Sequence, residues 1–191
     1  LLAAGGARVL VLEKERFPRF HIGESMLPQS RPIWERLWVL ETMNERYMVK
    51  NGARFVCSRT DRETTYYFDD AFDASTKSAF QVPRADFDDM LLRRSEALGA
   101  EVRHLWAVKD VIQENDFVVG VRAEDPAGQS HELRAKVVID ATRRDALLAS
   151  RKAEKQRGPG LDKTALFTHY EGVGRQSGRD EGNIDIVTTP Q

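Results

Sequence analysis

Two short, almost wholly apolar segments constrain the fold more than any other feature of the chain. Residues 8–13 (RVLVLE) and 136–140 (KVVID) lack the alternation of polar and apolar side chains that marks a half-exposed strand. Such runs are typical of strands buried on both faces in a parallel sheet. Between them the sequence predicts a helix over residues 85–98, which Gly99 ends, followed by a run of short strands. The pattern favours an α/β fold with an antiparallel insert over an all-helical or sandwich fold.

The remaining elements follow from shorter patterns. Residues 28–40 predict a helix with Trp34 and Trp38 beside its apolar stripe, and residues 41–47 and 146–151 predict two shorter helices. Strands are expected over residues 53–58, 64–68, 78–82, 101–105, 107–113, 118–123, 131–134, 166–170 and 184–188. Two of these strands are expected to form a hairpin across residues 114–117.

Composition excludes several classes of protein. Hydrophobic residues make up 41% and charged residues 31% of the chain, which is ordinary for a globular protein. The formal net charge of −1 gives no reason to expect nucleic acid as a partner, and no apolar run approaches the ~20 residues of a membrane span. Cys57 is the single cysteine, so no intrachain disulfide can form and a cytoplasmic location is expected. The histidines lack metal-ligand spacing, so no metal site is expected.

Glu13 ends the first apolar strand. An acidic residue at this position of a dinucleotide-binding βαβ unit binds the ribose hydroxyls of adenosine. Residues 1–4 already resemble the interior of a helix. We therefore expect the chain to lack the strand and glycine-rich loop that open such a unit.

Residues 17–28 (FPRFHIGESMLP) combine aromatic, basic, glycine, acidic and hydroxyl residues in one loop, and such loops often contact a ligand. The string resembles the segment that follows the second strand in flavin-dependent halogenases and related FAD oxidoreductases. Three further segments are similar to this family in order and spacing: residues 50–55 (KNGARF), 82–91 (VPRADFDDML) and 137–145 (VVIDATRRD).

The resemblance implies a Rossmann-like FAD-binding domain with an inserted antiparallel β portion of a substrate domain, as in relatives of p-hydroxybenzoate hydroxylase. Residues 1–48 and 84–150, the latter with the β-meander, would belong to the FAD-binding domain. Residues 49–83 would form substrate-domain strands, and residues 151–191 would cross into the substrate domain.

The resemblance also places a set of residues at FAD. These are Glu13 at the ribose, Gly23, Glu24 and Ser25 along the flavin, Arg84 at the pyrophosphate or ribityl chain, and Asp140, Ala141 and Thr142 near the third strand. A guanidinium can bind phosphate oxygens in bidentate fashion, which suits Arg84 to its place. Two plainer interpretations stay open: a local salt bridge of Arg84 with the aspartates that follow it, and capping of the next helix by Glu24.

Lys50 is the candidate catalytic residue. In halogenases that resemble this chain, reduced flavin, oxygen and halide generate hypohalous acid, which passes to a lysine beside the organic substrate. The resemblance implies halogenation of an electron-rich aromatic compound, free or tethered to a carrier protein. It also implies chloride or bromide as the halide and a separate flavin reductase that supplies FADH2. The plainer interpretation is a solvated lysine ahead of a strand.

Two departures from the family leave other functions open. Arg143 stands where the family usually has glycine, and the chain ends where a W-x-W-x-I-P segment would be expected. The alternatives are a related FAD-dependent monooxygenase, dehydrogenase or prenyl-group reductase, and a truncated, non-catalytic remnant that serves as a binding module. Because the glycine-rich loop supplies much of the pyrophosphate binding, we expect the isolated chain to bind FAD weakly.

Overall fold

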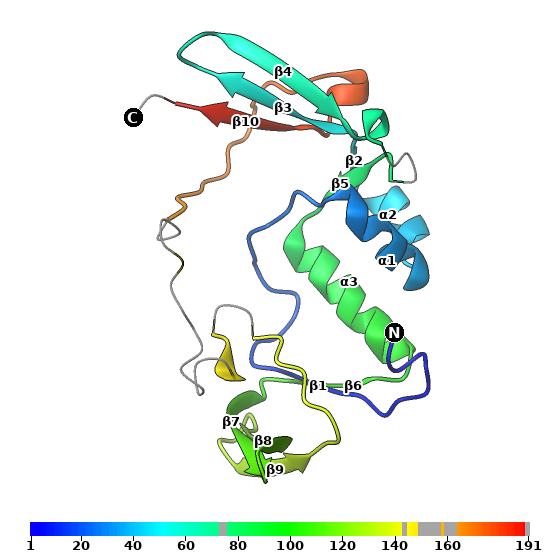
Figure 1. Ribbon diagram of the computed structural model, residues 1–191, viewed down its shortest axis with the longest axis vertical. Helices are drawn as coiled ribbons and strands as arrows, with labels where there is room; N and C mark the ends of the chain where they lie inside the picture. The colour runs from blue at the N-terminus through cyan, green and yellow to red at the C-terminus, as the bar shows by residue number, and fades with distance from the viewer. Residues whose placement is uncertain (73–75, 143–144, 149–157, 159–163, 190–191) are drawn as a thin grey trace. The chain divides into compact units, whose positions relative to one another are not determined.

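The computed structural model describes residues 1–72, 76–142, 145–148, 158 and 164–189. The chain divides into two compact units. The first unit comprises Leu1–Val9, Phe17–Glu101 and Gly172–Gln191, and the second comprises Leu10–Arg16 and Val102–Glu171. Helices occur together with parallel and antiparallel strand pairs, which confirms the predicted α/β class (Figure 1). The predicted domain boundaries stay a prediction.

The described residues of the first unit form three helices and three short 3-10 turns. The helices are α1 (Arg31–Arg36), α2 (Leu40–Arg46) and α3 (Arg84–Ala97), and the turns are η1 (Pro28–Ser30), η2 (Phe68–Asp70) and η3 (Gly178–Asp180). Helix α3 agrees with the predicted helix to within one residue at each end. Its N-cap Pro83 is extended, and Asp86 lies in its first turn, where the helix dipole favours a negative charge.

The single helix predicted over residues 28–40 is wrong, because the chain leaves the helix after Arg36. Trp38 has a φ of 55°, in the left-handed region, and the Val39 N–H donates to the Trp34 carbonyl. Such a 6→1 hydrogen bond beside a left-handed residue is typical of a helix C-terminus. The break separates the two tryptophans: Trp34 is buried, whereas Trp38 is 64% exposed.

The strands of the described residues form four small sheets. In the first unit, β2 (Met48–Lys50) pairs antiparallel with β5 (Ala79–Gln81), and β3 (Gly52–Cys57) lies between antiparallel β4 (Arg62–Tyr67) and parallel β10 (Ile184–Thr188). Elsewhere, β1 (Leu10–Glu13) pairs with β6 (Glu101–His104), and β7 (Ala107–Glu114), β8 (Phe117–Glu124) and β9 (Ser130–Arg134) form an antiparallel meander (Figure 1).

The predicted hairpin across residues 114–117 is confirmed as the turn between β7 and β8. Its two central residues, Asn115 and Asp116, have φ values of 48° and 68°. Two positive φ values match the right-handed twist of the flanking strands, and Asn and Asp tolerate them better than most residues do. The local sequence therefore accounts for this turn.

Three strand predictions fail in the second unit. Residues 136–140 form no strand, and Val137 is 74% exposed, because no neighbouring strand pairs with this segment in the described structure. Residues 166–170 also form no strand, for the same reason. Strand β1 exists, but Leu10 is exposed, so the strand is not buried on both faces as predicted. The predicted helix over residues 146–151 lies partly outside the described residues.

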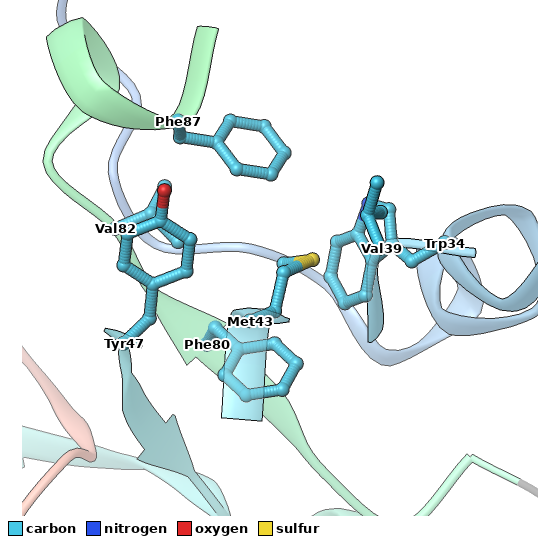
Figure 2. Packing of buried hydrophobic residues seen from close by; sticks show 7 residues of the cluster. All are labelled: Trp34, Val39, Met43, Tyr47, Phe80, Val82 and Phe87. Atoms are coloured by element: carbon cyan, nitrogen blue, oxygen red, sulfur yellow. The ribbon is translucent and has the colours of Figure 1, made fainter. Parts of the chain in front are cut away.

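A compact apolar core holds the helices of the first unit against β5 (Figure 2). Its buried members are Trp34, Val39, Met43, Tyr47, Phe80, Val82 and Phe87. The rings of Trp34 and Phe80 lie 5.6 Å apart between centroids, and those of Tyr47 and Phe87 lie 6.1 Å apart. Since Phe80 and Val82 come from β5 and its continuation, this core fixes the strand on which the candidate site is built.

Candidate functional site

Lys50 is the last residue of β2 and lies directly opposite Ala79 of β5. Its side chain is 2% exposed, so the alternative of a solvated lysine is wrong. Lysine is among the residues least often buried in proteins, because its charge must be removed from water. The groups that surround the Lys50 amine must therefore account for its burial.

The surroundings of Lys50 contain a hydroxyl and an aromatic ring. Lys50 Nζ donates a hydrogen bond to Ser25 Oγ at 2.8 Å, and it lies 5.3 Å from the ring centroid of Phe68. Within the described residues, no carboxylate forms an ion pair with Lys50. Burial consequently lowers the pKa of Lys50 from its ordinary value of 10.5. The amine is thus held in a setting that favours its neutral form more than water does.

The loop at residues 23–25 continues the sheet of β2 and β5. Ser25 forms a single antiparallel bridge with Gln81 of β5. On either side of it, Val82 N–H donates to the Glu24 carbonyl and Met26 N–H donates to the Phe80 carbonyl, each at 2.9 Å. Strand β5 therefore lies between the loop and β2, and it holds Ser25 and Lys50 in a fixed register.

Arg84 fastens the same loop to helix α3. Its guanidinium makes a bidentate pair with Asp88 at 2.8 and 2.9 Å. Its Nη1 group also donates to the carbonyls of Ile22 and Gly23 at 3.1 and 3.2 Å. The local salt bridge considered from the sequence is therefore present, and the same side chain positions the loop. A contact between Arg84 and the pyrophosphate or ribityl chain of FAD stays a prediction.

Gly23 adopts a backbone conformation that side chains rarely tolerate. Gly23 has a φ of 107°, and a Cβ atom there would lie 3.1 Å from Arg84 Nη1. Any other residue would be strained and would crowd the guanidinium. The local structure thus accounts for a glycine at position 23, and the contact with flavin stays a prediction.

Four predicted FAD residues belong to the second unit. Glu13 Oε1 accepts the backbone N–H of Glu15 at 2.8 Å, at the end of β1. Asp140 accepts hydrogen bonds from the Thr142 N–H and hydroxyl at 2.9 and 2.6 Å and from the Leu148 N–H at 2.9 Å. The hydrogen bond from the Thr142 hydroxyl is the main reason why the pKa of Asp140 is lowered. Ala141 is exposed between them.

The structure therefore brings together Lys50, Ser25, Glu24, Gly23 and Arg84 within the first unit. Glu13, Asp140, Ala141 and Thr142 belong to the other unit, and Arg143 lies outside the described residues. Two participants were missed from the sequence: Phe68 and Ala79. The i, i+4 spacing of Arg84 and Asp88 was visible in the sequence, whereas the places of Phe68 and Ala79 depend on strand pairing.

No group of three or more His, Cys, Asp or Glu side chains among the described residues could hold a metal ion. No helix in that part of the chain has both the length and the apolar character needed to cross a membrane.

Known proteins similar to this chain include halogenases. A 1H-pyrrole-2-carbonyl peptidyl-carrier-protein brominase of Pseudoalteromonas luteoviolacea is 32% identical over 97% of this chain and 44% of its own length. The structure of the myxobacterial chondrochloren halogenase CndH matches with a TM-score of 0.69 and 39% identity over 73% of this chain and 32% of that one. A flavoprotein/dehydrogenase of Cytophaga hutchinsonii matches with a TM-score of 0.77 and 28% identity over 97% and 46%.

These matches confirm the family resemblance and the fold that it implied. No protein-family model matches the chain. The chain spans less than half the length of the curated relatives it matches first. Several of those relatives are named flavin-dependent halogenases, brominases or chlorinases, and the alignments extend over most of this chain. The chain belongs to the flavin-dependent halogenase family.

Proposed function

We propose that the protein is a flavin-dependent halogenase that uses FADH2, O2 and halide to halogenate an electron-rich aromatic substrate. The observation that carries this proposal is the buried Lys50 amine, hydrogen-bonded to Ser25 of the loop whose sequence resembles the flavin-contacting segment of the family. A buried amine without a carboxylate is costly to keep, so a chemical role explains its presence better than a structural one does.

Bound FAD would supply the chemistry that oxidises halide with O2 to hypohalous acid. Lys50 would then act on that small electrophile, either by donating a hydrogen bond to it or by taking up its halogen. In the second case an N–halogen bond forms as the O–halogen bond breaks, and the oxygen leaves as water with a proton from the amine. The lowered pKa of Lys50 favours the second role by increasing the fraction of neutral amine. The two roles need the same placement of Nζ, which Ser25 Oγ and the Phe68 ring supply.

The loop residues would hold the cofactor beside this amine. Gly23, Glu24 and Ser25 would contact the flavin through their backbone, and Arg84 would keep that backbone in place through the Ile22 and Gly23 carbonyls. Glu13, Asp140, Ala141 and Thr142 are proposed as further FAD-binding residues of the second unit. The side-chain oxygens of Asp140 already accept local hydrogen bonds, so its contact with FAD would be through the backbone or would require those bonds to exchange.

The proposed partners follow from the relatives. The Pseudoalteromonas brominase is named for a pyrrole group on a peptidyl-carrier protein, which supports a carrier-tethered aromatic substrate for this protein as well. A separate flavin reductase as the source of FADH2 and a cytoplasmic location are part of the same proposal.

A halide-independent flavoenzyme is the second candidate function. The match to a flavoprotein/dehydrogenase covers nearly the whole chain, so the fold alone does not require halide chemistry. A monooxygenase or reductase would keep the flavin loop and Arg84, and it would give the Lys50 amine a different target. A non-catalytic remnant would give Lys50 no target at all.

Lys50→Ala in the complete protein tests the proposal. We expect halogenated product to fall at least about 100-fold while O2 consumption continues, because Lys50 acts after the halide has been oxidised. The measurement is chromatographic product analysis together with an oxygen electrode. Lys109→Ala is the matched control, since Lys109 is exposed and pairs with Glu124. Full turnover of the substrate by the parent protein in halide-free buffer would overturn the halogenase function.

A further inference from the structure

Lys50 reaches its hydroxyl partner by crossing an entire strand. Ser25 lies opposite Gln81, and Lys50 lies opposite Ala79, on the two sides of β5. Neighbouring strands are about 4.8 Å apart, so the two backbones that carry Ser25 and Lys50 are separated by roughly 10 Å. The long lysine side chain and the short serine side chain together span this separation and meet at 2.8 Å.

Ala79 allows this crossing. Residues opposite one another on paired strands point to the same face, and residues two apart on one strand do so too. Ser25, Ala79, Gln81 and Lys50 therefore share one face of the small sheet. Ala79 is fully buried and has only a methyl group, which leaves room above β5 for the lysine stem. The longer Gln81 side chain is directed away, because its Nε2 donates to the Gly182 carbonyl at 3.0 Å.

We infer that Ser25 is the positioning residue for Lys50: its hydroxyl, presented by the flavin-binding loop across Ala79, fixes the direction of the amine for halogen transfer. This inference rests on the proposed function. It gives Ser25 a task at the amine, in addition to the backbone contact with flavin that the loop is proposed to make. The loop then links the two parts of the site, because the residue that follows Gly23 and Glu24 also orients Lys50.

A hydroxyl suits this task better than a carboxylate would. A carboxylate would hold Lys50 as a permanently charged ammonium group, which cannot take up halogen on nitrogen. Ser25 Oγ accepts one hydrogen from the amine and so restricts its rotamers, while the remaining positions on nitrogen have no other hydrogen-bond partner among the described residues. The Phe68 ring, 5.3 Å from Nζ, covers the amine without adding an acceptor of comparable strength.

The test uses the complete protein with three substitutions at one position. Ser25→Ala removes the acceptor, Ser25→Cys keeps the approximate size with a weaker acceptor, and Ser25→Thr keeps the hydroxyl. Ser95→Ala is the control, since the Ser95 hydroxyl bonds to the Leu92 carbonyl on α3. The readouts are the pKa of the Lys50 amine by NMR of lysine-labelled protein, the fraction of consumed O2 that appears as halogenated product, and the affinity for FAD.

We expect Ser25→Ala and Ser25→Cys to lower the pKa of Lys50 further, because the lost acceptor had stabilised the ammonium form. The product formed per O2 should fall about tenfold, the loss expected for one hydrogen bond to a charged group. Affinity for FAD should change less than about twofold, because the backbone of the loop is intact, and Ser25→Thr should restore most of the product. Ser95→Ala should leave all three measurements unchanged.

The inference is overturned if the two variants weaken FAD binding while the pKa of Lys50 stays constant, since Ser25 would then serve the flavin alone. It is also overturned if both variants retain full coupling of O2 to product. Failure of the proposed function looks different, because the parent protein itself would then form no halogenated product. In that case the NMR measurement still decides whether Ser25 holds the Lys50 amine.

Discussion

The meander of β7, β8 and β9 and the small sheet that carries Lys50 differ in where their charged side chains lie and in what compensates them. In the meander, charged side chains pair across strands at the surface, as in Lys109 with Glu124 at 2.8 Å and Arg122 with Glu132 at 3.0 Å. In the small sheet, a lysine is buried with a hydroxyl as its hydrogen-bond acceptor. Cross-strand pairs in water contribute tenths of a kcal/mol, whereas a buried cation lowers stability unless it is compensated.

This difference distinguishes charged pairs that stabilise the fold from a buried amine whose desolvation lowers the stability of the fold. The Arg84–Asp88 pair lies between the two extremes. Its side chains are only 16% and 13% exposed, but they carry opposite charges and are joined by two hydrogen bonds. The comparison therefore ranks three kinds of charge by the effect of their removal. Breaking a compensated, largely buried pair should lower the free energy of unfolding most. Removing the charge of an amine that has no carboxylate partner should raise it, and breaking an exposed pair should change it least.

Asp88→Ala should have the largest effect on stability. It leaves the Arg84 guanidinium largely buried without its carboxylate, so we expect the free energy of unfolding to fall by about 2–3 kcal/mol. Urea unfolding of the complete protein measures this. Asp89→Ala is the matched control, because Asp89 also pairs at i, i+4, with Arg93, whose side chain is 70% exposed. Equal losses in the two variants would remove the distinction between buried and exposed pairs.

Lys50→Met should act in the opposite direction. Methionine fills a similar volume without a charge, so the free energy of unfolding should rise by about 1 kcal/mol at pH 7 while halogenation is lost. Between the lowered pKa of folded Lys50 and 10.5, the unfolded state binds more protons than the folded state does. The stability of the parent therefore rises with pH in that window, and the advantage of Lys50→Met should narrow. Urea midpoints at several pH values measure this.

A loss of stability in Lys50→Met would contradict that interpretation. It would mean that the hydrogen bond to Ser25 and the contact with Phe68 outweigh the desolvation of the amine. Lys50 would then count as a structural residue of the small sheet, and the comparison between the two regions would fail at its central point. Lys109→Met provides the control for the same change at an exposed site.

The sequence predicted those elements whose causes are local. Helix α3 follows from its apolar spacing and flanking residues, and the β7–β8 turn follows from Asn115 and Asp116, which accept a positive φ. The break at Trp38 was missed, because no glycine marks the left-handed position there. Residues 136–140 were predicted as a strand because apolar composition resembles a buried strand, whereas a strand also needs a paired neighbour.

The candidate site also has parts that could be predicted from local sequence and parts that depend on strand pairing. The family resemblance pointed to Lys50 and to the loop of residues 23–25 separately, because each lies in its own sequence motif. The contact between them could not be predicted from the sequence, since it requires β5 to pair with both segments and a small residue at position 79. Pairing register is a property of strands far apart in the sequence, and no local pattern specifies it.

Arg122→Ala in the meander should have the smallest effect. The Arg122 guanidinium lies 3.0 Å from Glu132 and 3.6 Å from Asp110, yet it is about half exposed, so its removal should change local stability by no more than about 0.5 kcal/mol. Any loss should shrink further at high salt, because exposed pairs are screened. Hydrogen exchange of the β8 amides in the complete protein measures this.

Gly120→Ala on the same strand shows that the measurement is sensitive, because a Cβ there would lie 2.4 Å from the Leu133 carbonyl oxygen and should greatly reduce protection. If Arg122→Ala reduced protection as strongly as Gly120→Ala does, exposed pairs would be supporting the meander, and the contrast with the small sheet would be one of geometry instead of burial.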